Sequence, residues 1–206
     1  MAKSIQIGLA LGLLGIEFHS RRRNRAATHV RSLSEKGIEL KINQSFGNCP
    51  KYIQQHKIPF DFSKRKNKVD ISAISKFDQE AISLIQNADT FFVASEAHKK
   101  EFKDNEGADV SHRGGEKGFI RVDNSRTITI PDYSGNFHFN TFGNFLTNPK
   151  AGLLFIDFET GDLLTVTGKV EVLWDSPDVK DFPQAERLWT FNIDHGYWLK
   201  NALPFR

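Results

Sequence analysis

The chain has almost no cysteine and no long hydrophobic run. Cys49 is the only cysteine among 206 residues, so an intrachain disulfide and a zinc cluster built on cysteines are both excluded. An apolar stretch, Ile7 to Ile16, follows Lys3 and imitates a secretion signal, but no A-x-A-like cleavage site follows and Glu17 ends it. The stretch is also too short to span a bilayer. We therefore expect a buried strand here, in a cytoplasmic protein without a membrane segment.

The sequence also lacks the short motifs of common enzyme classes. It contains no G-x-S-x-G nucleophile elbow, no H-E-x-x-H zinc motif and no Walker loop. His112 and His138 have no neighbouring acidic or cysteine cluster, so we expect no metal site. No residue is assigned as catalytic from the sequence.

Aromatic residues and charge are unevenly distributed. The 18 Phe against 3 Trp and 3 Tyr suit half-buried strands and packed interfaces. Residues 1–70 hold 14 Lys and Arg against 5 Asp and Glu, and most of this excess lies in two runs, 21–25 and 64–68. Such runs are usually solvated turns or linkers, but they also bind phosphate groups. One alternative is therefore a non-redox binding module whose basic runs contact an acidic partner or, less favoured, nucleic acid.

A stretch near the start of the chain recurs deep inside it. Residues 12–30 align with 152–170 without a gap, and 37–49 align more weakly with the C-terminal segment, where Asn43 matches Asn192 and Gly47 matches Gly196. The six identities of the first alignment are Gly12/Gly152, Leu13/Leu153, Leu14/Leu154, Ile16/Ile156, Phe18/Phe158 and Val30/Val170. Each copy is predicted to form three strands, the third running into a short helix. Residues 1–58 are thus a partial half-repeat.

The remainder is predicted to be mainly β with short helices. Residues 59–74 are basic and lack periodicity, which indicates a linker. In the domain 75–206, apolar residues at helical spacing predict a helix over 75–87, and 152–158 and 163–174 are expected to be paired strands. Several short antiparallel strands with one or two short helices are typical of a small barrel.

One order of elements in this domain is informative. A strand carrying Ser111-His112-Arg113 precedes a strand that ends in an aromatic turn at 130–133. A polar segment then opens a helix that ends at Asn148-Pro149, and a hydrophobic strand and a return strand, 164–172, complete the series. This order resembles the flavin-binding half of the pyridoxamine 5'-phosphate oxidase-like, FMN-binding split-barrel family, over roughly residues 73–175.

The resemblance implies an FMN-binding split β-barrel preceded by a partial repeat of the same unit. It implies an FMN-dependent oxidoreductase of unassigned substrate, and a homodimer with the flavin at its interface. Deazaflavin or haem are alternatives to FMN within the same class. The S-R-K run that clamps phosphate in the true oxidases is replaced here by Ser134-Gly135-Asn136, and their Arg-rich C-terminal signature is missing. Oxidation of pyridoxamine phosphate itself is therefore not expected.

The same resemblance implies the cofactor-binding residues. A phosphate dianion is bound by guanidinium forks, hydroxyl and backbone N–H donors and a helix N-terminus, while the flavin ring needs a few hydrogen bonds at its pyrimidine edge. The residues expected to supply these contacts are Ser111, His112, Arg113, Arg121, Asp132, Tyr133, Asn136, Asn140, Thr141 and Asn144.

Overall fold

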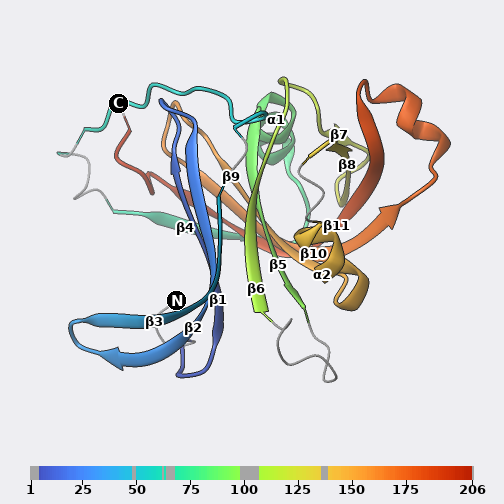
Figure 1. Cartoon of the computed structure of the whole chain (residues 1–206). Coiled ribbons are helices and arrows are strands. Elements are labelled where there is room, and N and C mark those ends of the chain that lie inside the picture. The colour runs from blue at the N-terminus through green and yellow to red at the C-terminus, as the bar shows by residue number, and fades with distance from the viewer. Residues whose placement is uncertain are drawn as a thin grey trace.

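The strands form two separate antiparallel sheets (Figure 1). The computed structural model describes residues 5–47, 50–61, 63, 68–97, 107–135 and 139–205. The N-terminal sheet has the order β1-β2-β3, and the main sheet has the order β6-β5-β9-β10-β11-β8-β7, with β4 paired to β11. Neither sheet is closed. The predicted fold class, mainly β with short helices in a split barrel, is confirmed.

The bounds of the elements are as follows. The N-terminal sheet contains β1 (Ala10–Glu17), β2 (Arg22–Ser34) and β3 (Gly37–Phe46). The main sheet contains β4 (Asp70–Ile74), β5 (Thr90–Ala97), β6 (Gly107–Gly114), β7 (Arg121–Val122), β8 (Thr127–Tyr133), β9 (Lys150–Ile156), β10 (Leu163–Leu173) and β11 (Ala185–Lys200). The helices are α1 (Gln79–Asn87) and α2 (Asn140–Thr147), with a 3-10 turn at Pro177–Asp181. Within the described residues, neither helix has the length and apolar character needed to cross a membrane.

The hydrophobic core is formed by side chains of the main sheet and of both helices, α1 and α2. Helix α1 begins after Asp78, whose side chain accepts a hydrogen bond from the backbone N–H of Ala81. Its apolar stripe buries Ala81 and Ile85, while β5, β9 and β11 contribute large buried side chains. The helix predicted over 75–87 therefore exists, and its N-cap sets its start.

The two copies of the repeat have the same hydrogen-bonding register. In the first copy Leu13 pairs with Ala26, and in the second Leu153 pairs with Val166, which are the aligned positions. The ladder between the second and third strands bulges at the same step in both copies, and the first copy has a further register shift between Val30 and Ser32. The pairs Thr28–Ile42 and Ala27–Gln44 pass over Asn43, and the pairs Gly168–Ile193 and Thr167–His195 pass over Asp194. The bulges lie at aligned positions of the two strand pairs. This agreement supports the repeat independently of the sequence match.

The bulges correct the alignment of the third strands. Asn43 corresponds to Asp194 in the structure, whereas the sequence alignment matched it with Asn192. A shift of two residues along a strand keeps every side chain on its face, so the hydrophobic pattern cannot detect it. The helix expected after each third strand is absent from the described residues, since β11 continues as a strand to Lys200.

The predicted linker is partly a strand. Asp70–Ile74 form β4, which pairs antiparallel with the end of β11 from Gly196 to Lys200. Four of its five residues are exposed, so the segment shows no buried face in its sequence, and the edge of β11 gives it its conformation. The basic residues 64–67 lie outside the described part of the chain, and the domain boundaries at 58 and 74 stay predictions.

Candidate functional site

A cavity lies where the N-terminal sheet meets the main sheet. It is bounded by β2, β6, the end of β8, the start of α2 and the segment that follows β3. Figure 1 shows β1 running beside β6, so the two sheets face each other along this line. Seven of the ten predicted residues line the cavity: Ser111, His112, Arg113, Asp132, Tyr133, Asn140 and Thr141.

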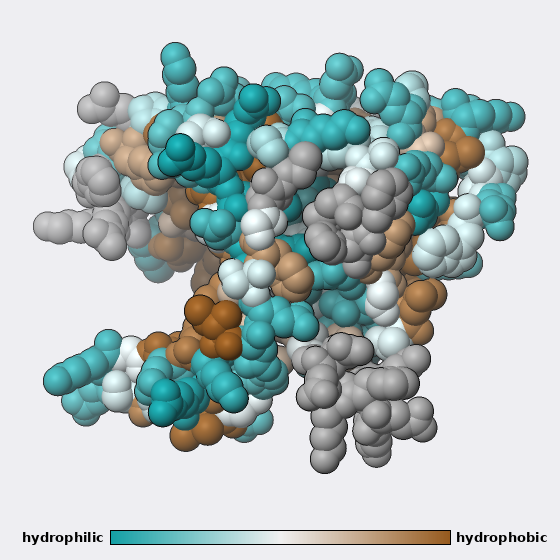
Figure 2. Space-filling view, in the orientation of Figure 1, coloured by the Kyte–Doolittle hydropathy of each residue, from teal (hydrophilic) through white to brown (hydrophobic). Residues whose placement is uncertain are grey.

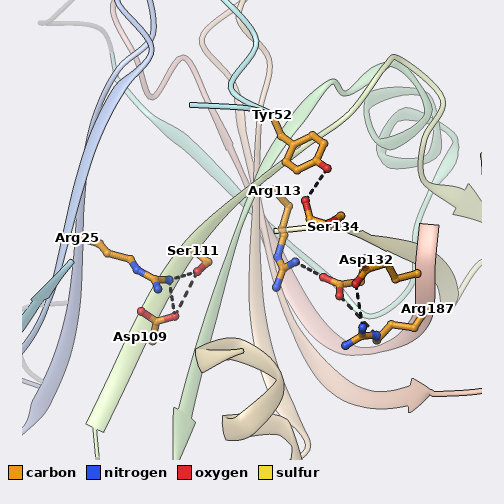
Figure 3. Close-up of polar contacts among 9 residues, drawn as sticks. Arg25, Tyr52, Asp109, Ser111, Arg113, Asp132, Ser134 and Arg187 are labelled. Carbon is orange, nitrogen blue, oxygen red and sulfur yellow. Dashed lines mark hydrogen bonds and ion pairs between the residues drawn. The ribbon is translucent and has the colours of Figure 1, made fainter. Parts of the chain in front are cut away.

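An ion pair crosses the cavity wall from β6 to β8. Arg113 Nη1 lies 2.6 Å from Asp132 Oδ1, and Arg187 Nε lies 3.8 Å from the other carboxylate oxygen (Figure 3). Burial raises the pKa of Asp132, while the charge of Arg113 opposes this shift. The Arg113 guanidinium also lies over the ring of Phe142, 5.3 Å from its centroid. Its Nε has no hydrogen-bond partner among the described residues. A buried donor is thus left at the cavity.

His112 is buried as a neutral imidazole. Its burial, together with the positive charges of Arg23 and Arg113, lowers the pKa of His112 to about 3. Within the described part of the chain, its Nε2 is buried and has no hydrogen-bond partner. Buried polar atoms are nearly always paired in folded proteins. A lining atom without a partner therefore indicates a place where a ligand makes the missing contact.

The first turn of α2 lines the same cavity. The helix starts after Phe139, whose backbone is left-handed with φ of 47° and whose side chain cannot cap the helix. Asn140 and Thr141 line the cavity, and Thr141 is buried. The N-terminus of a helix carries partial positive charge and N–H groups, so it favours an anion.

Two of the predicted residues, Arg121 and Asn144, are not brought to the cavity. Arg121 donates to Asp123 at 2.7 Å and to Asp178 at 3.1 Å, and hydrogen bonding to Asp123 raises its pKa. Asn144 Nδ2 donates to Ser95 Oγ at 2.9 Å on the buried side of α2. Neither lines the cavity. Asn136 lies outside the described residues.

Sequence reasoning missed the residues that the N-terminal copy contributes, among them Arg23, Arg25, Lys51 and Tyr52. Arg25 is only 8% exposed; it donates to Ser111 Oγ, and its Nη1 lies 3.2 Å from Asp109 Oδ2. For the run 21–25 the charge pattern predicts a solvated turn or linker. If this run is taken as a strand, Arg23 and Arg25 lie on the same face because they are two residues apart. This spacing is the feature of the sequence that could have indicated their shared role.

Tyr52 joins the cavity from the segment after β3. Its hydroxyl donates to the carbonyl oxygen of Ser134 at 2.7 Å (Figure 3). Its ring stacks on Tyr133, with centroids 5.5 Å apart. No motif in the sequence indicates this contact, because it depends on the path of an irregular segment.

Several solved structures are distantly similar to this chain. Among solved structures, a putative pyridoxamine 5'-phosphate oxidase from Lactobacillus delbrueckii is 18% identical, covering 60% of this chain and 94% of that one, with a TM-score of 0.44. An FMN-binding protein from Syntrophomonas wolfei is 13% identical, covering 57% and 86%, with a TM-score of 0.39. HutZ, the heme storage protein from Vibrio cholerae, is 14% identical, covering 61% and 95%, with a TM-score of 0.42.

No curated protein matches the sequence. The sequence model of the pyridoxamine 5'-phosphate oxidase family, in contrast, matches residues 77–195. The match includes β6, β8 and α2, the elements of the main sheet that form the cavity. Because it extends over more than half of the chain, the resemblance seen in the sequence is confirmed, and the protein belongs to the pyridoxamine 5'-phosphate oxidase family.

Proposed function

We propose that the protein binds FMN in this cavity and acts as a flavin-dependent oxidoreductase. One observation carries the proposal: a cavity rich in basic side chains holds a buried imidazole nitrogen without a partner among the described residues. Arg23, Arg25, Lys51 and Arg113 supply positive charge, which suits a ligand that ends in a phosphate dianion.

The residues present fit the two ends of FMN. The phosphate would be held by the guanidinium of Arg113, whose Nε is still without a partner in the described structure, and by the first turn of α2 with the Thr141 hydroxyl. The rings of Tyr133 and Phe142 offer apolar walls for a flat aromatic system. His112 would reach the polar edge of that system. These groups come from three different elements, so the fold itself brings them together.

The chain's own residues would bind and orient the cofactor. When bound, the flavin supplies hydride or electron transfer at its N5 atom. His112 stays neutral near pH 7, so it contributes a hydrogen bond and no charge. Asp132 is occupied by Arg113, and this pair fixes the direction of the guanidinium. The substrate is unassigned, and pyridoxamine phosphate is not proposed.

The test compares two arginine variants in an FMN titration followed by flavin fluorescence. Arg113→Met should weaken FMN binding about ten- to a hundredfold, because a charge-assisted hydrogen bond is lost. Arg121→Met is the matched control: Arg121 pairs with Asp123 and Asp178 away from the cavity, and its variant should bind like the wild type. Circular dichroism would check that both variants fold. The proposal would be refuted if added FMN changed neither the fluorescence signal nor the melting temperature of the wild-type protein.

Haem is the second candidate, and His112 is the observation that favours it. A neutral imidazole with an open Nε2 is the form that ligates haem iron. Absorbance of the purified protein separates the two candidates, since a Soret band that His112→Ala abolishes would assign haem. A flavin spectrum that survives in this variant would assign FMN.

Other expectations from the sequence stay predictions. Arg23 and Arg25 line the cavity, where Arg23 is half-buried and Arg25 is buried, while Arg21 and Arg22 are exposed. This arrangement gives the basic run a role other than binding nucleic acid or an acidic partner. The homodimer, a deazaflavin ligand and the cytoplasmic location are likewise untested.

A further inference from the structure

We infer that the N-terminal copy of the repeat completes the cavity within the same chain, in the place that the resemblance assigns to a second subunit. The N-terminal copy means β1–β3 and the segment 50–58. The identity of the ligand rests on the proposed function, whereas the closure of the cavity rests on contacts of the protein alone.

The first contact is a close approach of backbones. A Cβ on Gly12 would lie 2.8 Å from the carbonyl carbon of Asp109, so β1 lies against β6 at a distance that only glycine allows. A Cβ on Gly15, in the same strand, would meet nothing within 4 Å. The approach is therefore local to the point where the two sheets face each other.

Arg25 makes the second contact. It reaches from β2 to Asp109 and Ser111 on β6 (Figure 3), and the side chains of Arg25 and Asp109 are 8% and 11% exposed. A buried charge that has lost its partner is strongly destabilising. Asp109 therefore depends on the N-terminal copy even in the absence of a ligand.

The segment after β3 makes a third contact on the other side of the cavity. The carbonyl oxygen of Tyr52 lies where a side chain on Gly114 would be, so this segment crosses the end of β6 closely. His56 Nε2 lies 3.0 Å from Asp89 Oδ1, and its ring stacks on Phe158 with centroids 4.1 Å apart. The N-terminal copy is thus fixed to the main sheet through β2 and again through the segment after β3.

The charges show what this copy adds to the cavity. Among the described lining residues, the main sheet and α2 supply one cation, Arg113, and two carboxylates, Asp132 and Glu186. The N-terminal copy supplies Arg23, Arg25 and Lys51. When the ion-pair partners Arg187 and Asp109 are counted as well, the main sheet and α2 contribute one more negative than positive charge. The three cations of the N-terminal copy make the total positive, which favours a phosphate. Each chain consequently contains a whole anion-binding site.

The first experiment needs no ligand. Urea unfolding of the full chain gives the coupling between Arg25→Met and Asp109→Asn from the two single variants and the double variant. If the pair forms within one chain, the coupling is the same at protein concentrations that differ about a hundredfold. A coupling that disappears on dilution, or that is absent at every concentration, would overturn the inference.

The second experiment mixes two variants. Arg25→Met and Arg113→Met are unfolded together, refolded and titrated with FMN. If both arginines of a site come from one chain, the mixture binds as weakly as the separate variants do. If the site is shared between subunits, about a quarter of the sites regain wild-type affinity, because half of the dimers are mixed and each holds one intact site. If the wild type itself binds no FMN, the proposed function fails, and the coupling still decides whether the cavity is closed within the chain.

Discussion

The two copies of the repeat share their backbone pairing but differ in how deeply matched side chains are buried. Leu13 and Leu153 occupy the same position, yet their side chains are 43% and 1% exposed. Ile42 and Ile193, on the third strands, are 63% and 0% exposed. The second copy is covered by α1, β5 and β8, whereas the hydrophobic side chains of the first lie partly on the surface, as the brown area over the projecting sheet in Figure 2 shows.

The two copies also differ in charge on their second strands. By the shared register, Arg23 and Arg25 of the first copy stand where the second has Leu163 and Thr165. The same backbone pairing thus supports a strand that packs in the core, in the second copy, and a strand that lines the cavity with arginines, in the first. The neighbours of a strand, more than its register, decide which of these it becomes. Each of the following predictions tests one part of this comparison.

The largest difference should come from the paired leucines. Leu153→Ala removes a fully buried side chain and should lower the free energy of unfolding by about 3 kcal/mol. Leu13→Ala, the same change at the same ladder position, should cost less than about 1 kcal/mol because its side chain already contacts water. Urea denaturation of both variants measures the difference. Equal losses would mean that the first copy is covered in solution.

The pH dependence of stability should show how the first copy acts on His112. The folded protein holds the pKa of His112 at about 3, against 6.5 for the ordinary side chain, so protons bind the unfolded state first as the pH falls. Its contribution to stability is complete above pH 6.5 and should decrease by about 1.4 kcal/mol per pH unit, which is about 2 to 3 kcal/mol by pH 4.5.

Thermal or urea unfolding across this pH range is the measurement. His112→Gln, which cannot titrate, is the control and should remove that part of the slope. If the variant keeps the full slope, another group is responsible for it.

Adding a single methyl group at Gly12 should weaken the contact between the two sheets. Gly12→Ala places a Cβ 2.8 Å from the backbone of Asp109 and should cost about 1.5 kcal/mol while loosening the N-terminal sheet. Gly152→Ala, the matched position of the second copy, places a Cβ in ordinary contact with Ala94 Cβ at 3.7 Å and the Val166 carbonyl oxygen at 4.0 Å, and should cost less. Limited proteolysis would follow the loosening, and a Gly12→Ala variant as resistant as Gly152→Ala would contradict the close approach.

The smallest effect is expected from one hydroxyl. Tyr52→Phe removes the hydrogen bond to the Ser134 carbonyl and should lower stability by about 1 kcal/mol. Tyr197→Phe, on the exposed face of β11, is the control and should leave the unfolding midpoint unchanged. A midpoint for Tyr52→Phe that equals the control would show that solvent replaces this bond at no cost.

Much of the fold could be predicted from the sequence because its signals are local. The strand alternation, the spacing of α1 and the repeat all lie in short stretches of letters, and the order of elements identified the family. The strand β4 could not be predicted, since its exposed residues carry no periodic pattern and the edge of β11 imposes its conformation. Seven predicted site residues meet at the cavity because they belong to neighbouring elements of that order.

The other half of the site could not be predicted for a different reason. Arg25 reaches the cavity because the two sheets face each other, and Tyr52 reaches it because the irregular segment after β3 crosses the end of β6. The sequence pattern indicates neither of these long-range contacts. Arg121 shows the reverse error: it lies on a strand near the site, but Asp123 and Asp178 hold its guanidinium elsewhere. Distances along the chain do not reveal which way a long side chain turns.

The bulge at Asn43 has a consequence for the arginine that faces the cavity. The extra residue changes the phase of β3, so that Phe46 lies on the side where its ring is 4.9 Å from the Arg25 guanidinium. If the pairing continued regularly from Thr28–Ile42 without a bulge, Ser45 would stand opposite Arg25 and Phe46 would lie on the other face of the strand. One unpaired residue, inherited in both copies, therefore decides whether Arg25 has an aromatic ring behind it.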